Sequence, residues 1–559
     1  MGKSMEKDKM SVWRFYAANA LLLVAMLLLL SLVGVTNVEL AAGETVGQWV
    51  WFDKMAMAAG GLVLFVLLVL GQRKYWFSSG YLLLVALMLW GGVEAVWGLC
   101  QLYGFAVSGH SRYALTGSFF NPGPYAGYLA MVLPVCVCRT VGLWFRWDCM
   151  EFPLKVERCI AMASGACILC VLPATMSRSA WLAAGVSCVC AVGMEKEWGQ
   201  AWLGMWRHDR KRAWLAVAAV VTTLLLAFAL MCSIKQDSAR GRFLMWKVAC
   251  HAVAEKPWCG HGAGSFAGAY GEAQERYFAQ ESYGWWEEHV AGSPKYAFNE
   301  YLKVAVEHGI PAAVLVVCVI GLCLWRGIRQ EEYGMCAAII SLAVFSFSSY
   351  PLLFPAFRVV LVALLLLCVV RPGWKTWVIG ALAVAAYGAC RLADDRRMLD
   401  ACREEVNVRI LYRAGAYEAA LKDYERLYPM LKAKDGFMFE YGHCLHKLER
   451  YAESNRVLEE AMTLSSDPMI LNIIGKNHQQ MGDYRAAEDW FVRAVHRLPG
   501  RIYPYYLLAK LYAEPGFRQP EKFEEMKRIV LTKKPKVNST AIREMREELE
   551  KLEDVNKDK

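Results

Sequence analysis

Charged residues are scarce in this chain of 559 residues: Asp, Glu, Lys and Arg make up 20% of it, against 57% for hydrophobic residues. The scarcity is uneven, because long apolar runs end near Ala389 and the last third of the chain is much richer in charge. This composition excludes a chain made only of water-soluble domains. We therefore expect a membrane-embedded part followed by a water-soluble part.

Apolar runs fill the first part. A run of about 20 apolar residues can cross the hydrocarbon core of a bilayer as a helix, which satisfies its own backbone hydrogen bonds. We predict an all-α membrane bundle of about eleven spans with loose edges. The predicted spans are residues 17–35, 55–70, 81–102, 126–144, 159–176, 180–194, 213–234, 311–325, 335–347, 359–370 and 377–389.

Two further features are missing. No convincing small-residue cleavage site follows the first apolar run, so we expect a retained helix rather than a signal peptide. The 19 cysteines form no disulfide or metal framework either, because most lie inside apolar runs, where a thiol packs as a small hydrophobe. Only Cys250 and Cys259, in a large loop, form a pair worth testing as a disulfide.

The positions of the Lys and Arg residues indicate the membrane topology. Lys and Arg crowd the N-terminus and then recur in alternate loops, from Arg73 and Lys74 to Arg371 and Lys375. Because positive residues mark cytoplasmic loops, the N-terminus is expected in the cytoplasm and, after an odd number of spans, the C-terminus in the periplasm. The predicted location is the bacterial inner membrane. The net charge of +10 then calls for no nucleic-acid partner.

The last third carries a repeat. Tyr417, Tyr451 and Tyr484 stand in similar segments about 34 residues apart. With helix-ending prolines at Pro468 and Pro499, this pattern resembles the tetratricopeptide family over about residues 404–534. The resemblance implies a soluble α-solenoid of stacked helix pairs, with a concave groove for a protein partner or acceptor.

These patterns divide the chain into three domains. We predict a membrane domain over residues 1–392, with a large periplasmic loop at 235–310, and a periplasmic repeat domain over 393–540. The charged tail, 541–559, is expected to be a solvated helix end or disordered.

The large loop contains basic residues, which the positive-inside rule does not predict for a periplasmic loop. Arg240, Arg242, Lys247, Lys256 and Arg276 need an anionic partner, which can be a ligand or a carboxylate of the same loop. The loop carboxylates are Glu272, Glu275, Glu281, Glu287 and Glu288.

Two charged residues stand out in the apolar part. Arg178 lies between two apolar runs, where it either reaches lipid headgroups or binds a diphosphate with its planar, five-donor guanidinium. Glu94 lies deep in the third predicted span and either makes a structural hydrogen bond to another helix or serves function.

Several motifs occur in the order seen in the O-antigen ligase and polymerase superfamily, which includes the bacterial protein O-oligosaccharyltransferases. They are residues 116–122 with 126–129, 177–183, 241–243 with Trp246, 257–266, 299–302 with Glu307 and Gly309, and 349–351. The resemblance covers about residues 81–355.

This resemblance implies a C-type glycosyltransferase membrane fold. Such enzymes transfer a glycan from an undecaprenyl diphosphate carrier to a lipid, glycan or protein acceptor in the periplasm. The donor sugar is already activated, so no metal or other cofactor is expected. Arg178, with one or both of Arg240 and Arg242, would hold the diphosphate.

One position departs from the family pattern. Many of these ligases carry a histidine directly before the Asn of the Asn-x-Tyr-Leu segment, whereas this chain has Phe298 before Asn299. Phenylalanine cannot accept a proton. Either Glu300, Glu307 or His261 replaces the histidine as base, or the reaction needs no base, or transfer activity has been lost.

Two other functions stay open. Phe298 favours a non-catalytic membrane scaffold of the same fold, whose repeats recruit envelope proteins. A transporter of lipid-linked glycan would also use Arg178 and Glu94, but it would carry charges across several spans, and the spans are nearly bare.

The predicted topology can be tested with a cysteine placed in the repeat domain. A membrane-impermeant thiol label should reach Ser465→Cys in intact spheroplasts, above the background of the wild-type protein. Labelling that appears only after lysis would place the repeats in the cytoplasm.

Overall fold

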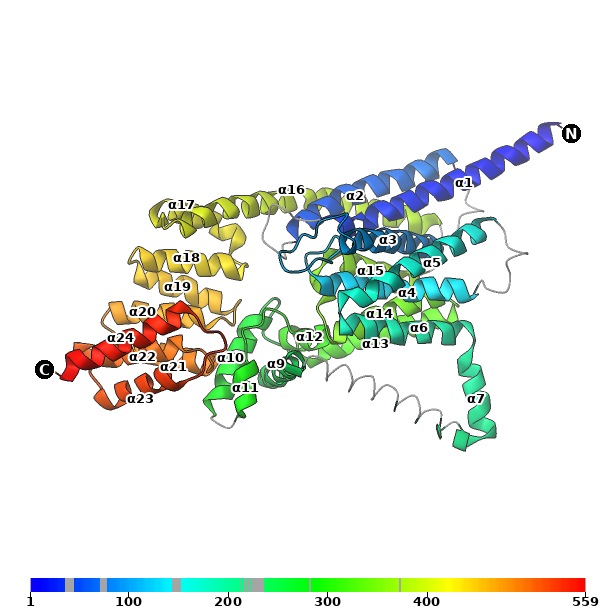
Figure 1. Ribbon diagram of the computed structural model, residues 1–559. Coiled ribbons are helices and arrows are strands. Elements are labelled where there is room, and N and C mark those ends of the chain that lie inside the picture. Colours follow the sequence, from blue (N-terminus) through cyan, green and yellow to red (C-terminus); the bar gives the residue numbers. More distant parts are fainter. Residues whose placement is uncertain are drawn as a thin grey trace. The chain divides into compact units, whose positions relative to one another are not determined.

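A computed structural model describes residues 2–35, 45–70, 78–142, 152–212, 214–215, 218, 222, 236–280, 283–370 and 374–557. The described residues form helices and no strand (Figure 1), which confirms the predicted all-α class. The predicted span at 213–234 lies almost wholly outside the described residues, as does Glu281.

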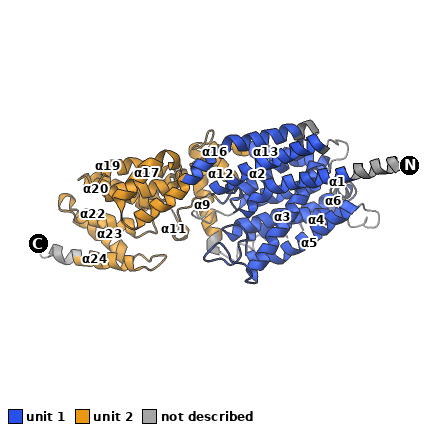
Figure 2. Ribbon diagram, turned by 90° about the horizontal axis from the view of Figure 1, so that it is seen from above, with its two compact units in different colours: residues 1–231, 298–300, 315–400 blue, residues 232–297, 301–314, 401–559 orange. Residues whose placement is uncertain are grey.

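The chain forms two compact units (Figure 2). Unit 1 comprises Met1–Met231, Phe298–Glu300 and Leu315–Asp400, and unit 2 comprises Cys232–Ala297, Tyr301–Val314 and Ala401–Lys559.

These units depart from the predicted domain boundaries. Most of the predicted loop at 235–310 joins the C-terminal helices in unit 2 rather than the membrane bundle. The predicted boundary at 392/393 falls inside α16 (Trp374–Arg413), a continuous helix of 40 residues. The helix continues because neither glycine nor proline interrupts it after Gly388, and it ends just before Gly415, which takes the left-handed conformation (φ 80°) that glycine favours.

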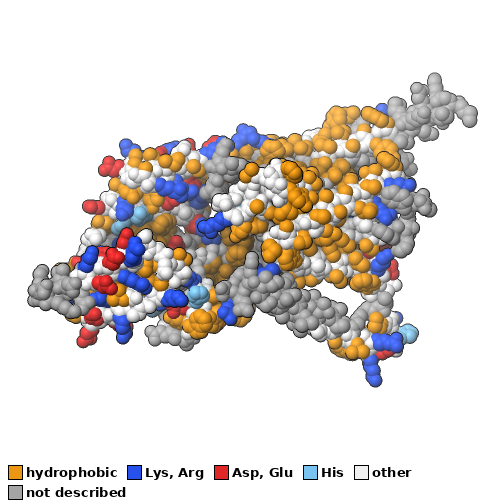
Figure 3. Space-filling model, viewed as in Figure 1, with side chains coloured by type: hydrophobic (Ala, Val, Ile, Leu, Met, Phe, Trp, Pro, Cys, Tyr) orange, Lys and Arg blue, Asp and Glu red, His pale blue; other side chains and the backbone are white. Residues whose placement is uncertain are grey.

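Unit 1 contains most of the apolar helices. Among the described residues, six helices are long and apolar enough to span a membrane: Trp13–Gly34, Val46–Val69, Ser79–Leu102, Pro122–Gly142, Phe152–Thr175 and Ile310–Arg329. Two shorter apolar helices, Tyr333–Phe347 and Pro355–Val369, coincide with further predicted spans. Hydrophobic side chains cover the visible face of these helices, whereas charged side chains spread over the C-terminal helices (Figure 3). A membrane bundle is therefore supported, and the count of eleven spans stays a prediction.

The helix α4 (Pro122–Gly142) packs against α3 (Ser79–Leu102), α5 (Phe152–Val171), α6 (Arg178–Glu195) and α14 (Tyr333–Phe347). Small residues permit these contacts. A Cβ atom added at Gly91 would lie 2.6 Å from Val132, and one at Gly127 would lie 2.1 Å from Phe345. The Ser341 hydroxyl donates a hydrogen bond to the Ala130 carbonyl at 2.7 Å. Close approach and interhelical hydrogen bonds are the usual means of packing helices in a bilayer.

Unit 2 begins with the helices of the predicted loop. These are α9 (Gln236–Glu255), α10 (Phe266–Ala279), α11 (Trp285–Val290) and α12 (Glu300–His308), whose first residue lies in unit 1. Neither Cys250 nor Cys259 is bridged, so the disulfide that we considered does not form.

Consecutive helices then pack on one another through the C-terminal part of unit 2. They are α17 (Tyr417–Leu431), α18 (Asp435–Lys447), α19 (Tyr451–Met462), α20 (Pro468–Gln480), α21 (Tyr484–Arg497), α22 (Tyr503–Ala513) and α23 (Pro520–Thr532). The repeated tyrosines Tyr417, Tyr451 and Tyr484 are the first residues of α17, α19 and α21. They thus mark every second helix, as a repeat made of helix pairs requires. Their assignment to the tetratricopeptide family stays a prediction.

The charged tail is not free in solvent. Residues 540–557 form the helix α24, which packs against α22 and α23. Leu549 is fully buried, and Glu548 accepts a hydrogen bond from Lys510 at 2.8 Å. Of the two alternatives predicted for the tail, the structure favours the helix end over disorder. Ile542, Met545 and Leu549 recur at helical spacing and form one apolar stripe.

Ion pairs hold the loop helices on the C-terminal helices within unit 2. The Glu275 carboxylate on α10 accepts hydrogen bonds from Arg493 at 2.6 Å and from Arg497 at 2.8 Å, both on α21. Arg497 is fully buried. Nearby, a Cβ atom added at Gly268 would lie 2.3 Å from the Thr463 carbonyl oxygen. The contact therefore depends on both charge and close backbone approach.

Removing Glu275 should destabilise this contact strongly. Glu275→Ala leaves the buried Arg497 charge without its carboxylate, which typically costs about 3–5 kcal/mol. The control, Glu255→Ala, breaks an exposed ion pair with Arg276 and should cost about 1 kcal/mol or less. The rate of amide hydrogen exchange in α10 and α21 measures the destabilisation that each variant causes. Equal effects of the two variants would show that Glu275 does not stabilise the contact.

Candidate functional site

Arg178 is the first residue of α6. A short 3-10 helix, Leu172–Thr175, ends at Met176 in the left-handed conformation (φ 52°), and the chain reverses there. The Trp181 indole N–H donates to the Leu172 carbonyl at 2.9 Å and holds this reversal. Arg178 is partly buried at the N-terminus of a helix, where the backbone N–H groups favour an anion.

The segment between α14 and α15 (Pro355–Val369) lies beside α6 and Glu300 in unit 1. The Ser179 hydroxyl donates to the Ser348 carbonyl at 3.3 Å. The Leu352 N–H donates to Glu300 Oε1 at 2.9 Å, and Arg358 Nε donates to the Leu352 carbonyl. Residues 348–352 thus connect Ser179, the neighbour of Arg178 in the chain, to Glu300.

Phe298 and Asn299 adjoin the same segment. The Phe298 ring stands edge-on to Tyr350, with ring centroids 5.0 Å apart. Phe298 has a left-handed backbone (φ 48°), a conformation in which Asn, Asp and His are enriched over Phe. Asn299 and Glu300 are both buried. Five residues lie around the 348–352 segment: Arg178, Phe298, Asn299, Glu300 and Arg358. We call these five residues the 348–352 site, after that segment.

Arg358 was missed by the sequence analysis. It follows the Ser349-Tyr350-Pro351 motif and precedes a predicted span, so it occupies a predicted exterior loop just as Arg178 does. The same signal could therefore have identified it.

Arg240 and Arg242 lie on α9 in unit 2. Arg240 is exposed and Arg242 partly buried. Residues two apart on a helix point about 200° apart, so the two guanidinium groups leave the helix on different faces. Arg242 shares its face with Trp246, whose indole N–H donates to the Ala297 carbonyl at 3.2 Å. Of the two arginines, Arg242 is therefore the one that is partly buried and lies on the face of α9 that contacts Ala297 within unit 2.

Two other basic residues of the loop, Lys247 and Arg276, have carboxylate partners. Lys247 donates to Glu287 at 2.9 Å, which confirms the ion pairing expected within the loop. Burial acts to raise the pKa of the Glu287 carboxyl, but hydrogen bonds from Lys247, Gly284 and Tyr277 outweigh burial and hold that pKa below its ordinary value. Arg276 instead pairs with Glu255, which the sequence analysis did not include.

His261 and Glu307 belong to a structural joint in unit 2. The His261 N–H donates to the Val306 carbonyl and the Gly262 N–H to the Glu307 carbonyl, both at 2.9 Å. A Cβ atom added at Gly260 would lie 2.4 Å from the Glu307 carbonyl carbon. The His261 ring Nε2 lies 2.9 Å from the Ala252 carbonyl oxygen and can only donate to it, so only Nδ1 could accept a proton.

Glu300 and Glu307 lie on the same face of α12, about 10 Å apart along its axis. They cannot both contact one acceptor hydroxyl. Of the three proposed bases, Glu300 alone lies in the 348–352 site.

Glu94 clamps a turn. Its Oε2 accepts the Ser118 N–H at 3.0 Å, and its carbonyl accepts the Tyr125 hydroxyl at 2.9 Å. Gln101 Oε1 accepts the N–H groups of Thr116 and Gly117, at 3.0 and 2.8 Å. This geometry favours the structural alternative for Glu94. It also explains the 116–122 motif as a turn that α3 holds from inside.

The clamp makes a specific stability prediction. Glu94→Gln retains an oxygen acceptor and should change stability by less than about 1 kcal/mol, whereas Glu94→Ala leaves the Ser118 N–H unpaired and should cost about 1–3 kcal/mol. Thermal unfolding in detergent compares the two variants. If Glu94→Gln abolished donor binding while keeping wild-type stability, Glu94 would be a ligand-binding residue.

The described residues contain no group of three or more His, Cys, Asp or Glu side chains that could hold a metal ion. No curated protein matches the chain. Residues 163–317 match the family model described as O-antigen ligase. The matched range includes Arg178, Arg240, Arg242, His261, Phe298, Asn299, Glu300 and Glu307. Together with the apolar helices of unit 1, this match shows a membrane protein that carries a domain similar to the O-antigen ligases, a family of glycan transfer in envelope polysaccharide synthesis.

Proposed function

We propose that this protein transfers a glycan from an undecaprenyl diphosphate carrier to a lipid, glycan or protein acceptor at the periplasmic face of the inner membrane. The observation that carries the proposal is the position of Arg178. It begins α6 beside residues 348–352, inside the range that matches the O-antigen ligase family.

Charge neutralisation is the main requirement of this reaction. The bond between the anomeric carbon and the carrier phosphate breaks, and its electron pair leaves with the diphosphate. The acceptor oxygen forms the new bond to that carbon and loses its proton. A guanidinium binds two phosphate oxygens through parallel N–H groups, and fixed cations at the developing charge lower the barrier. We assign this role to Arg178 and Arg242, with Arg240 as the weaker candidate.

Glu300 is the base that we propose in place of the family histidine. Its carboxylate is buried, and the Leu352 N–H fixes its orientation. A positioned base within hydrogen-bond reach of the acceptor contributes about 10²–10⁴-fold to the rate. Asn299, its neighbour, offers an amide for a sugar hydroxyl. His261 and Glu307 are less suitable because both belong to the structural joint of unit 2.

We propose that unit 2 supplies the acceptor side. Its C-terminal helices carry the predicted tetratricopeptide pattern, whose concave groove fits a segment of protein. Within unit 2 these helices contact α10, so an acceptor bound to the repeats would be attached to the loop that carries Arg242.

A non-catalytic scaffold of the same fold is the second candidate, and Phe298 favours it. Its ring packs on Tyr350 where a proton acceptor is expected, so the site could hold a lipid-linked glycan without transferring it. In that case the repeats would recruit envelope proteins to the membrane unit.

Donor binding tests the assignment of the arginines. Arg178→Ala and Arg242→Ala should each weaken binding of a lipid diphosphate analogue by about 1.5–3 kcal/mol, the usual value of a charge-assisted hydrogen bond. Arg276→Ala serves as the control, because Arg276 already pairs with Glu255. Titration of the analogue into nanodiscs measures the three affinities. Unchanged binding in both test variants would return these arginines to a structural role.

A further inference from the structure

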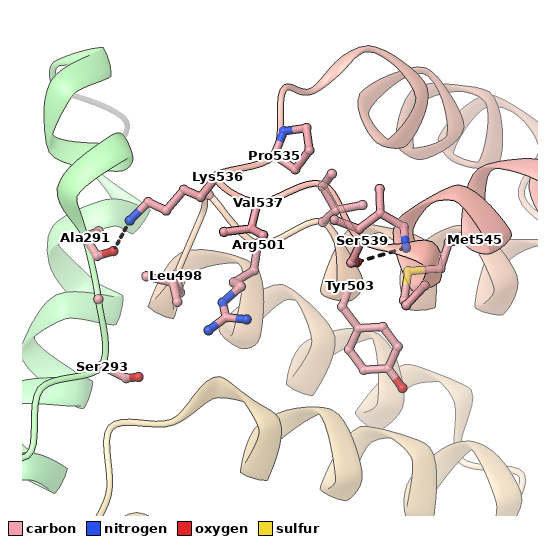
Figure 4. Close-up of a pocket in the computed structure, with 15 residues that line it drawn as sticks. Ala291, Ser293, Leu498, Arg501, Tyr503, Pro535, Lys536, Val537, Ser539 and Met545 are labelled. Atoms are coloured by element: carbon pink, nitrogen blue, oxygen red, sulfur yellow. Dashed lines mark hydrogen bonds between the residues drawn. The ribbon is translucent and has the colours of Figure 1, made fainter. Parts of the chain in front are cut away.

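An open cavity of about 560 Å³ lies at the surface of unit 2, where Arg501 and Lys536 are exposed. Residues 291–293, which follow α11, form one wall, and the residues that lead into α22 and α24 form the others (Figure 4). The volume is within the usual range for ligand pockets, about 300–1,000 Å³. The predicted groove of the repeats does not include residues 291–293, so this cavity is a separate feature.

Positive charge faces this cavity. Figure 4 shows the Arg501 guanidinium extending into the space between Ser293 and Val537. No ion pair of Arg501 occurs among the described residues. Lys536 donates to the Ala291 carbonyl at 2.7 Å, and its other donors have no carboxylate partner in that part of the chain. The nearby Glu288 already pairs with Lys533 at 2.6 Å.

The pKa of Lys536 agrees with this arrangement. Burial lowers it, the positive charge of Arg501 lowers it further, and the Glu288 carboxylate raises it in part. Two cations therefore line a cavity whose lining residues include no Asp or Glu, and an anionic ligand would relieve their repulsion.

Most of the remaining wall residues are apolar, and Ser293, Ser539 and Tyr503 add hydroxyl groups. The apolar side chains include Leu498, Ile502, Ile542 and Met545, and Val537 is 75% exposed. A second hollow of about 210 Å³ adjoins the cavity, shares Arg501 and Tyr503 with it, and is also lined by Asp467 and Asn472. An extended ligand can therefore place an anionic group on Arg501 and apolar groups against the walls of the larger cavity.

A protein segment fits these walls better than a sugar does. Sugar rings pack on open aromatic faces, and Tyr503 is the one aromatic residue that lines the cavity. Its ring stacks on Tyr506, with centroids 6.2 Å apart, and its hydroxyl accepts a hydrogen bond from Lys476 at 2.5 Å. Clusters of basic side chains are typical of acidic peptide recognition.

We propose that this cavity binds an extended segment of a partner protein, with an Asp or Glu carboxylate on Arg501 and Lys536 and apolar side chains against Leu498, Ile502 and Met545. The inference rests on the part of the proposed function in which unit 2 recruits a protein, and it names the chemistry of that partner. Because residues 291–293 and α24 both line the cavity, a bound segment would fasten the loop to the C-terminal helix within unit 2.

Peptide binding to the full-length protein in nanodiscs tests the inference. The probes are a pool of fluorescein-labelled octapeptides with alternating acidic and apolar residues, and a matched pool with Gln and Asn in place of Glu and Asp. The acidic pool should bind at least about 10-fold more tightly, since one charge-assisted hydrogen bond is worth 1.4 kcal/mol or more. Arg501→Ala and Lys536→Ala should each remove most of that difference.

Lys534→Ala is the matched control, because it removes an exposed positive charge from the same segment without lining the cavity. It should bind the acidic pool as the wild type does. Equal binding of the two pools, or an equal loss in Lys534→Ala, would overturn the proposal. So would an oligogalacturonate that binds through Arg501 when the acidic peptides do not. No donor glycan is present, so failure here would leave the glycan-transfer proposal untouched.

Discussion

Polar groups in the membrane unit must find their partners inside the protein, because hydrocarbon offers none. This constraint explains why Glu94 and Gln101 hold the turn at Thr116–Ser118 from inside the bundle. It also explains the hydrogen bond from Ser341 to the Ala130 carbonyl, deep in the bundle. In unit 1 the hydrogen bonds from the Leu352 N–H to Glu300 and from Arg358 to the Leu352 carbonyl bring charged groups together at residues 348–352.

The same constraint suits the proposed reaction. A diphosphate cannot leave from an apolar surface without cations to receive it, and arginine supplies fixed charge with several donors. Arg178 begins a helix, Glu300 is oriented by the Leu352 N–H, and Arg358 is bonded to the Leu352 carbonyl. In the proposed site, the short segment at 348–352 therefore bonds both Glu300 and Arg358, and it contains the Ser349-Tyr350-Pro351 motif.

The sequence predicted those features that depend on residues close together in the chain. The apolar runs, the period of Tyr417, Tyr451 and Tyr484, and the isolated charge of Arg178 each followed from spacing or composition. The docking of α10 on α21 did not, because Glu275 and Arg497 are 222 residues apart and no local pattern links them. The clamp role of Glu94 needed the structure for the same reason. The burial of Leu549 could have been foreseen from its apolar stripe, which the high charge of the tail concealed.

Transfer from a purified undecaprenyl diphosphate glycan in proteoliposomes tests the central claim most directly. The measurement follows release of the carrier diphosphate by the wild-type protein and by Arg178→Ala, with and without an added acceptor. We predict release that requires both the acceptor and Arg178. Bound glycan lipid without release in the wild-type protein would contradict transfer and support the scaffold.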